Sequence, residues 1–231
     1  MATRARPDVD TLPHVIVVIG PVAARVDGDR TVPAGLAARV ATTAASAGRA
    51  VEVVTRLGDD AVGDAVLLSL AASGIGHVAT LRDAAHATPA MVSVDGPSDP
   101  DVGDDATESD GGREVDASAT ARATTPALDP EDVGLALRYL ADYRVIVVVH
   151  PAQDDVVSVT VAAAGYAGAH LVVISAPGAP LDGLPGDALA LSAPDDADGV
   201  ASLVGRYAAA VDEGVPPETA WAAEAGMLGV D

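Results

Sequence analysis

The sequence contains no cysteine, no lysine and no phenylalanine. Without cysteine, the chain can form no disulfides, no thiolate metal sites and no cysteine nucleophile. Aromatic residues make up 2% of the chain, so its core must be built from small aliphatic side chains. Ala, Val and Leu supply most of the 49% hydrophobic content, which excludes wholesale disorder and suits a parallel sheet covered by Ala-rich helices.

Positive charge is also scarce. The chain has 13 arginines and 34 acidic residues, which gives a net charge of −21. A field this negative repels nucleic-acid phosphates and anionic membrane surfaces, so neither is expected as a partner. It also repels a nucleoside triphosphate unless Mg²⁺ or a local Arg compensates. The bias fits adaptation to high salt, and it fits GC-rich coding about as well.

Long apolar runs are missing. The first run starts at Val15 and is too short to span a membrane, and the N-terminus lacks the layout of a signal peptide. A soluble, cytoplasmic protein is therefore expected. Walker A, G-x-S-x-G and Rossmann glycine motifs are absent, and the five histidines lack metal-ligand spacing. His150 and His170, at strand ends, are interpreted as structural residues.

What the sequence does contain is an alternation of strands and helices. Apolar runs such as "RVIVVVH" predict buried strands, and Ala-rich segments with helical spacing predict helices between them. The alternation predicts a layered α/β fold with a mostly parallel sheet. Strands are predicted at 14–20, 51–58, 77–81, 89–95, 144–150, 169–178 and 187–194, and helices at 34–48, 60–74, 129–143, 152–168, 197–214 and 216–229.

An acidic, Gly-rich stretch interrupts this pattern at residues 95–116. Its composition predicts a mobile loop. The acidic residues do not follow the spacing of an EF-hand, so a calcium loop is not expected.

The segment "RLGDDAVGDAVLLSLAASGIGHV" contains a Gly-Asp-Asp turn in which Asp60 can cap a helix. It resembles the G-D-D-x-x-G … L-x-x-x-G-V segment of the PfkB carbohydrate kinases, the ribokinase-like family. The first strand precedes this segment, and "DGGREVD" and "LDPEDV" come after it, in the same order as in the family. The resemblance covers roughly residues 14–178. The matching residues are Gly58, Asp59, Asp60, Gly63, Leu70, Gly74 and Ile75.

The resemblance implies a ribokinase-like three-layer α/β sandwich, with a mostly parallel central sheet and helices on both faces. It implies a single domain over residues 1–231, with a small β-lid formed by about 22–32 and 77–94. Because the family's lid often mediates dimers, a homodimer through the lid is expected as well.

The family's chemical motifs are only partly matched. The family's "GG-x-A-A-N-x-A" segment approaches the sugar, and its counterpart here is "AGLAARVA". Gly35 is retained, and Arg39 takes the Asn position. The resemblance thus names these two as substrate-binding candidates. An Arg there could bind an anionic ligand, and the alternative is a solvated helix residue.

The family's "D-T-x-G-A-G-D" motif, which supplies an anion-binding turn and a general base, has no counterpart. The nearest segment, "DGLPGDALAL", offers Asp187 as a base, but Pro185 removes one N–H and a strand is predicted to follow. A surface loop is the other interpretation. "APDDADGVASLVG" resembles the segment that organises Mg²⁺ water in the family, which makes Asp195 and Asp198 the candidate metal residues.

These departures favour a degenerate, non-catalytic member of the family that binds a sugar or nucleoside or has a regulatory role. The alternative is an active carbohydrate kinase with a divergent site, which would use ATP and Mg²⁺ with Asp187 or Asp198 as base. A third hypothesis is an interaction subunit whose partner supplies the missing segment.

Overall fold

The central layer of the protein is a sheet of six parallel strands in the order β5-β4-β1-β7-β8-β9. The computed structural model describes residues 14–92, 126–140, 142–150, 154–179, 182–194 and 197–228. The strands of this sheet are β1 (Val15–Ile19), β4 (Ala50–Gly58), β5 (Thr80–Asp83), β7 (Tyr143–Val149), β8 (His170–Ser175) and β9 (Leu189–Ser192).

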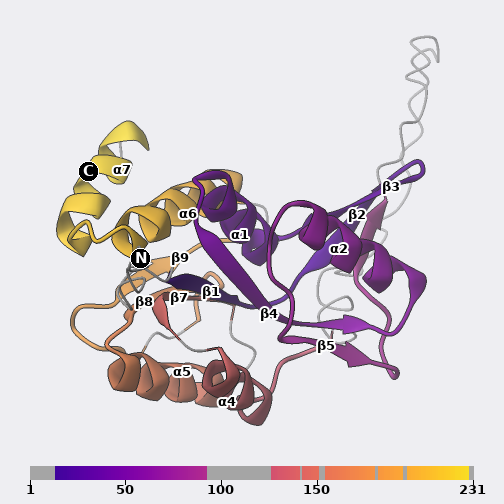
Figure 1. Cartoon of the computed structure of the whole chain (residues 1–231), viewed down its shortest axis with the longest axis horizontal. Helices are drawn as coiled ribbons and strands as arrows, with labels where there is room; N and C mark the ends of the chain where they lie inside the picture. The colour runs from indigo at the N-terminus through magenta and orange to yellow at the C-terminus, as the bar shows by residue number, and fades with distance from the viewer. Residues whose placement is uncertain are drawn as a thin grey trace, which may run out of the picture.

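Helices cover both faces of this sheet (Figure 1). On one face α1 and α6 pack on the central strands, with α2 and α7 beside them, and on the other face lie α4 and α5. The predicted three-layer α/β sandwich is therefore confirmed. The helices are α1 (Leu36–Ser46), α2 (Ala61–Ala72), α4 (Pro130–Tyr139), α5 (Asp154–Ala167), α6 (Asp198–Asp212) and α7 (Pro217–Leu228).

The core is divided by the sheet into two clusters. Along β1, Ile16 and Val18 point into the cluster under α1 and α6, and Val17 and Ile19 point into the cluster over α4 and α5. All four are buried because successive side chains of a strand point to opposite faces, and here both faces are covered. This explains why the strands read as continuous apolar runs.

A smaller sheet projects from the central one and has the order β3-β2-β6 (Figure 1). Strands β2 (Ala23–Asp27) and β3 (Arg30–Ala34) form an antiparallel hairpin, and β6 (Ala90–Val92) pairs parallel with β2. These strands occupy most of the segments expected to form a lid. One expected lid segment is different: β5 joins the central sheet, because after α2 it returns as a parallel neighbour of β4.

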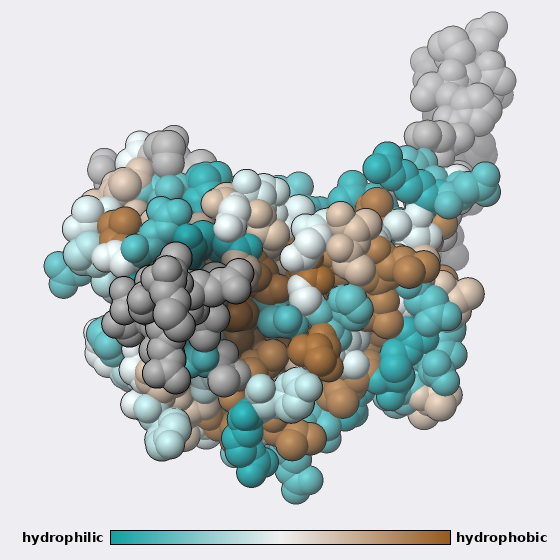
Figure 2. Space-filling view, in the orientation of Figure 1, coloured by the Kyte–Doolittle hydropathy of each residue, from teal (hydrophilic) through white to brown (hydrophobic). Residues whose placement is uncertain are grey.

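Outside these sheets, the acidic stretch at 95–116 lies beyond the described residues. No helix in the described ranges is long and apolar enough to cross a membrane. Figure 2 shows hydrophilic residues over the end of the small sheet, with hydrophobic residues gathered where Figure 1 places β4 and β5. Leu68 and Val78 are among the exposed apolar side chains of the chain.

Candidate functional site

The strand order has a switch point between β1 and β7. From β1 the chain crosses to β4 on one side, and from β7 it crosses to β8 on the other. In open parallel sheets, ligands bind in the crevice outside the carboxyl ends of the strands at such a point. The candidate site is therefore the region outside the carboxyl ends of β1 and β7, which is called the switch-point crevice below.

Two glycines shape the β1 side of this crevice. A Cβ on Gly20 would lie 2.6 Å from the carbonyl oxygen of Val149, so β1 and β7 can approach this closely only with glycine there. Gly35 has a φ of 91° at the start of α1, and a Cβ there would lie 3.7 Å from the carbonyl oxygen of Pro21. The start of α1 is thus held against the chain leaving β1.

The structure brings Arg39 and Asp198 together. Arg39 lies in the first turn of α1, and Asp198 is the first residue of α6; the two side chains form an ion pair. Helix α1 packs against β4 and β1, and α6 packs against β7 and β1. The pair therefore joins two helices over the switch point, and Arg39 is not the isolated, solvated residue of the alternative interpretation.

His150 follows the carboxyl end of β7 and so lies at the same end of the sheet. Its backbone has a φ of 43°, a left-handed conformation that non-glycine residues seldom adopt. Its backbone N–H donates to the Ile174 carbonyl at 2.7 Å, and its Nε2 donates to the Ala193 carbonyl at 2.8 Å. A carbonyl only accepts, so Nε2 is the donor in this hydrogen bond. In the sequence, the only signal for this residue is a polar side chain that closes a buried strand.

Asp187 lies at the opposite end of the sheet. It precedes β9 and so lies toward the amino end of that strand, whereas Asp198 follows the carboxyl end of the strand. Its charge acts on His170, at the amino end of β8: burial lowers the pKa of His170, and the charge of Asp187 opposes this. The structure therefore does not bring Asp187 to the switch-point crevice.

The environment of His170 explains its burial. Its Nε2 lies 2.7 Å from the hydroxyl of Tyr207, whose ring packs edge-on against Trp221. Burial raises the pKa of Tyr207 to about 12. These contacts tie β8 to α6 and α7.

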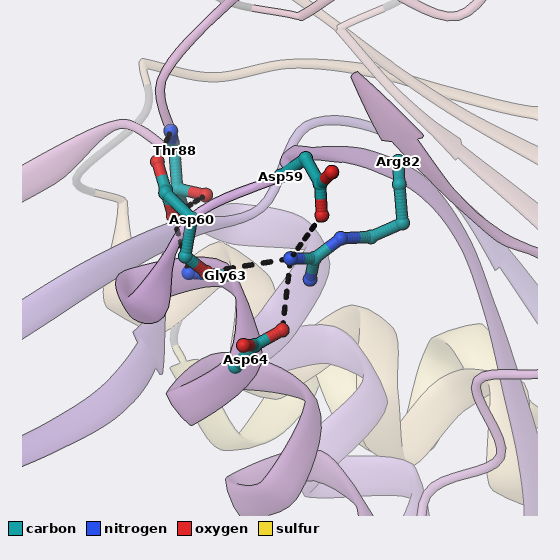
Figure 3. A network of polar contacts seen from close by, with 6 residues as sticks. All are labelled: Asp59, Asp60, Gly63, Asp64, Arg82 and Thr88. Carbon is teal, nitrogen blue, oxygen red and sulfur yellow. Dashed lines mark hydrogen bonds and ion pairs between the residues drawn. The ribbon is translucent and has the colours of Figure 1, made fainter. Parts of the chain in front are cut away.

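The Gly-Asp-Asp turn forms a separate polar network beyond β4 (Figure 3). Asp60 caps α2 by accepting from the backbone N–H of Gly63 at 2.7 Å, and it also accepts from the backbone N–H and hydroxyl of Thr88, at 2.7 and 2.8 Å. Burial disfavours the charge on Asp60, but these hydrogen bonds outweigh it and lower its pKa. The motif thus fastens the segment before β6 to α2.

Arg82 completes this network from the end of β5. Its guanidinium lies 2.8 Å from Asp64 and 3.3 Å from Asp59, and it donates to the carbonyl of Asp60 (Figure 3). All these contacts are internal to the fold. The Gly-Asp-Asp motif therefore has a structural role here, as the sequence predicted for the cap of α2.

The described residues do not fit a magnesium site. Asp195 lies outside them, and the carboxylate of Asp198 is already engaged by Arg39. Within the described ranges, no group of three His, Asp or Glu side chains converges in a way that could hold a metal ion.

A cavity lies away from the switch-point crevice. A groove of about 900 Å³ runs between α4 and α5 toward the amino end of β7, lined mainly by apolar side chains together with Tyr143 and Tyr166. It does not include any residue of the switch-point crevice.

No protein-family model and no curated protein matches the chain. Solved structures do. The structure of Sa239 matches with a TM-score of 0.59 at 12% identity, over 92% of this chain and 94% of that one. A PfkB protein from Polaromonas sp. JS666 matches with 0.51 at 19% identity, over 86% of this chain and 64% of that one.

A candidate ribokinase II from E. coli, in its apo form, matches with a TM-score of 0.50 at 15% identity, over 71% of this chain. The chain spans 53% of that structure's length and 64% of the Polaromonas protein's. At these identities the likeness concerns the fold. The six-stranded parallel sheet, its covering helices and these matches together assign the chain the ribokinase-like fold.

Proposed function

We propose that the chain is a non-catalytic binding or regulatory protein on a ribokinase-like scaffold, which holds a sugar or nucleoside in the switch-point crevice. The observation that carries the proposal is the position of the candidate bases. Asp187 lies at the far end of the sheet, and the carboxylate of Asp198 is paired with Arg39. A general base must lie within hydrogen-bond reach of the proton it removes, and an ion-paired carboxylate is a weaker base.

An active carbohydrate kinase that transfers the γ-phosphoryl group of ATP with Mg²⁺ is the second candidate. The match to a PfkB protein favours it at the level of the fold. It needs Asp198 to leave Arg39, and it needs metal ligands beyond the described residues. A third candidate is an interaction subunit completed by a partner, and the missing counterpart of the family's catalytic motif supports it.

The first experiment is a thermal-shift titration with MgATP alone and then with pooled sugars and nucleosides alone. A ligand that binds only the folded state raises the melting temperature with increasing ligand excess. The proposal expects a shift with a sugar or nucleoside and none with MgATP. A shift with MgATP would contradict it and support the kinase, and no shift with either would support the interaction subunit.

Phosphoryl-transfer assays separate the remaining hypotheses. If the wild type phosphorylates a sugar, Asp187→Ala is expected to keep that activity, because Asp187 lies away from the crevice, and Asp198→Ala is expected to lose it. Activity that appears only after mixing with a co-encoded kinase chain would favour the interaction subunit.

The small sheet is proposed as the surface of a homodimer. Met91 of β6 is 51% exposed, which supports this role. Size-exclusion chromatography with light scattering of the wild type and of Met91→Asp tests the proposal, and a monomeric wild type would contradict it. The negative net charge supports the absence of nucleic-acid and anionic-membrane partners.

A further inference from the structure

The ion pair between Arg39 and Asp198 lies over the crevice that the proposed function assigns to the ligand. We infer that this pair is an internal latch, and that the site takes a small polyhydroxylated molecule bearing an anionic group. In this inference, which rests on the proposed function, the carboxylate or phosphate of the ligand replaces Asp198 on Arg39.

The position of the two residues is the first step. At Gly35, the start of α1 lies against the chain leaving β1. The start of α6 follows Ala193, whose backbone N–H donates to the Ser175 carbonyl and whose carbonyl accepts from His150. Arg39 and Asp198 therefore reach toward each other from the two sides of the crevice.

The exposure of the two side chains is the second step. Asp198 is 69% exposed, so its carboxylate can leave the pair and be solvated with little change elsewhere. Arg39 is only 26% exposed, so its guanidinium stays at the crevice when Asp198 leaves. A half-buried guanidinium without a partner favours a new anion, and its planar fork suits a carboxylate or phosphate.

The surrounding charge is the third step. The chain carries a net charge of −21, which repels anions in general, so an anionic ligand needs a local cation. Two other arginines on β4 and β5 are engaged by carboxylates of the scaffold: Arg56 by Asp132, and Arg82 by Asp64. Among the described residues, Arg39 is the one arginine whose ion pair bridges the helices over the switch point.

The test compares binding of a neutral and an anionic probe. D-ribose and D-ribose 5-phosphate are titrated by calorimetry into the wild type, Asp198→Asn and Arg39→Gln, with inorganic phosphate as a further probe. Asp64→Asn is a matched control, because the Arg82–Asp64 pair has the same exposed fractions, 26% and 69%, and lies away from the crevice. It corrects for the loss of one negative charge.

Asp198→Asn is expected to bind ribose 5-phosphate about two- to fivefold more tightly than the wild type, the range of an exposed ion pair, with ribose unchanged. Arg39→Gln is expected to lose the preference for the phosphorylated probe, and Asp64→Asn is expected to match the wild type. Equal gains in Asp198→Asn and Asp64→Asn, or no gain, would overturn the latch.

The outcomes also separate the inference from the proposed function. If ribose binds but the phosphorylated probe binds no better in any variant, the latch fails and the binding function stands. If no probe binds any variant, the latch fails, and the thermal shift with pooled sugars and nucleosides decides the proposed function. Binding of inorganic phosphate alone, unaffected by Arg39→Gln, places the anion elsewhere and overturns the inference.

Discussion

At the scale of single residues, the side chain of Asp60 accepts three hydrogen bonds. It caps α2 and accepts two hydrogen bonds from Thr88. Asp60→Ala is expected to lower the free energy of unfolding at pH 7 by about 1–3 kcal/mol, the loss of a helix cap plus the unpaired Thr88 donors. Urea denaturation measures this change. Asp59→Ala is the control, because Asp59 makes only a 3.3 Å ion pair and should change stability little.

The same residue predicts a pH dependence. The hydrogen bonds to Asp60 in the folded state lower its pKa below the ordinary value of 3.8. Its contribution is therefore fully present above about pH 4 and is lost as the pH falls through the lower, folded pKa. The stability difference between the wild type and Asp60→Ala should shrink in urea titrations from pH 5 to pH 3. A difference that stays constant over this range would contradict the prediction.

His150 gives a second prediction at this scale. Its φ of 43° is strained, yet its ring donates to the Ala193 carbonyl at 2.8 Å. His150→Ala keeps the strain and loses the hydrogen bond, so a loss of about 1–2 kcal/mol in the free energy of unfolding is expected. Asn tolerates this φ better, so His150→Asn should be more stable than His150→Ala in the same denaturation assay. The reverse order would show that the strain is not set by the backbone.

At the scale of elements, the contact between α1 and α6 depends on Gly205. A Cβ at this position would lie 2.5 Å from the Cβ of Thr43 and 2.9 Å from the carbonyl oxygen of Val40. Gly205→Ala is expected to cost about 1–3 kcal/mol, although Ala is normally the better helix former. Gly199 lies in the same helix with open space where a Cβ would be, so Gly199→Ala is the control and should be neutral or stabilising.

Thermal unfolding of both variants measures the difference. Equal stability of Gly205→Ala and Gly199→Ala would mean that α1 and α6 can separate without cost. Because Arg39 and Asp198 lie at the ends of these two helices, such a result would also weaken the geometry on which the latch depends.

The sequence predicted the individual helices and strands better than it predicted how they pair or where the site lies. The apolar run of β1 and the Asp60 cap of α2 depend on neighbouring residues, so local pattern predicted both. The pairing of β6 with β2 and of β5 with β4 joins segments far apart in the chain, so local pattern could not assign it. The lid expected over 77–94 came from the family resemblance, and β5 lies in the central sheet instead. For the same reason the sequence did not predict the ion pair of Arg39 and Asp198, which requires the strand order to be known.

At the scale of the whole molecule, the site follows from topology more than from motif. The Gly-Asp-Asp motif carried the resemblance, and it proves to fasten α2 to the segment before β6. Asp187, chosen for its position in a motif-like segment, lies at the other end of the sheet. The switch point between β1 and β7 could not be read from the sequence, because strand order is set by which faces and edges remain to be covered.

The net charge of −21 is a property of the whole chain and gives the last prediction. Like charges repel in the compact state, so added salt should raise the melting temperature as it screens them. Melting curves in 0.01–4 M KCl measure the effect. A rise that levels off near about 0.5 M, where the Debye length has fallen to a few ångströms, indicates ordinary screening and favours GC-rich coding as the origin of the composition. A rise that continues into molar KCl favours adaptation to high salt, and a fall at low salt would mean that ion pairs such as Arg49–Asp212 outweigh the repulsion.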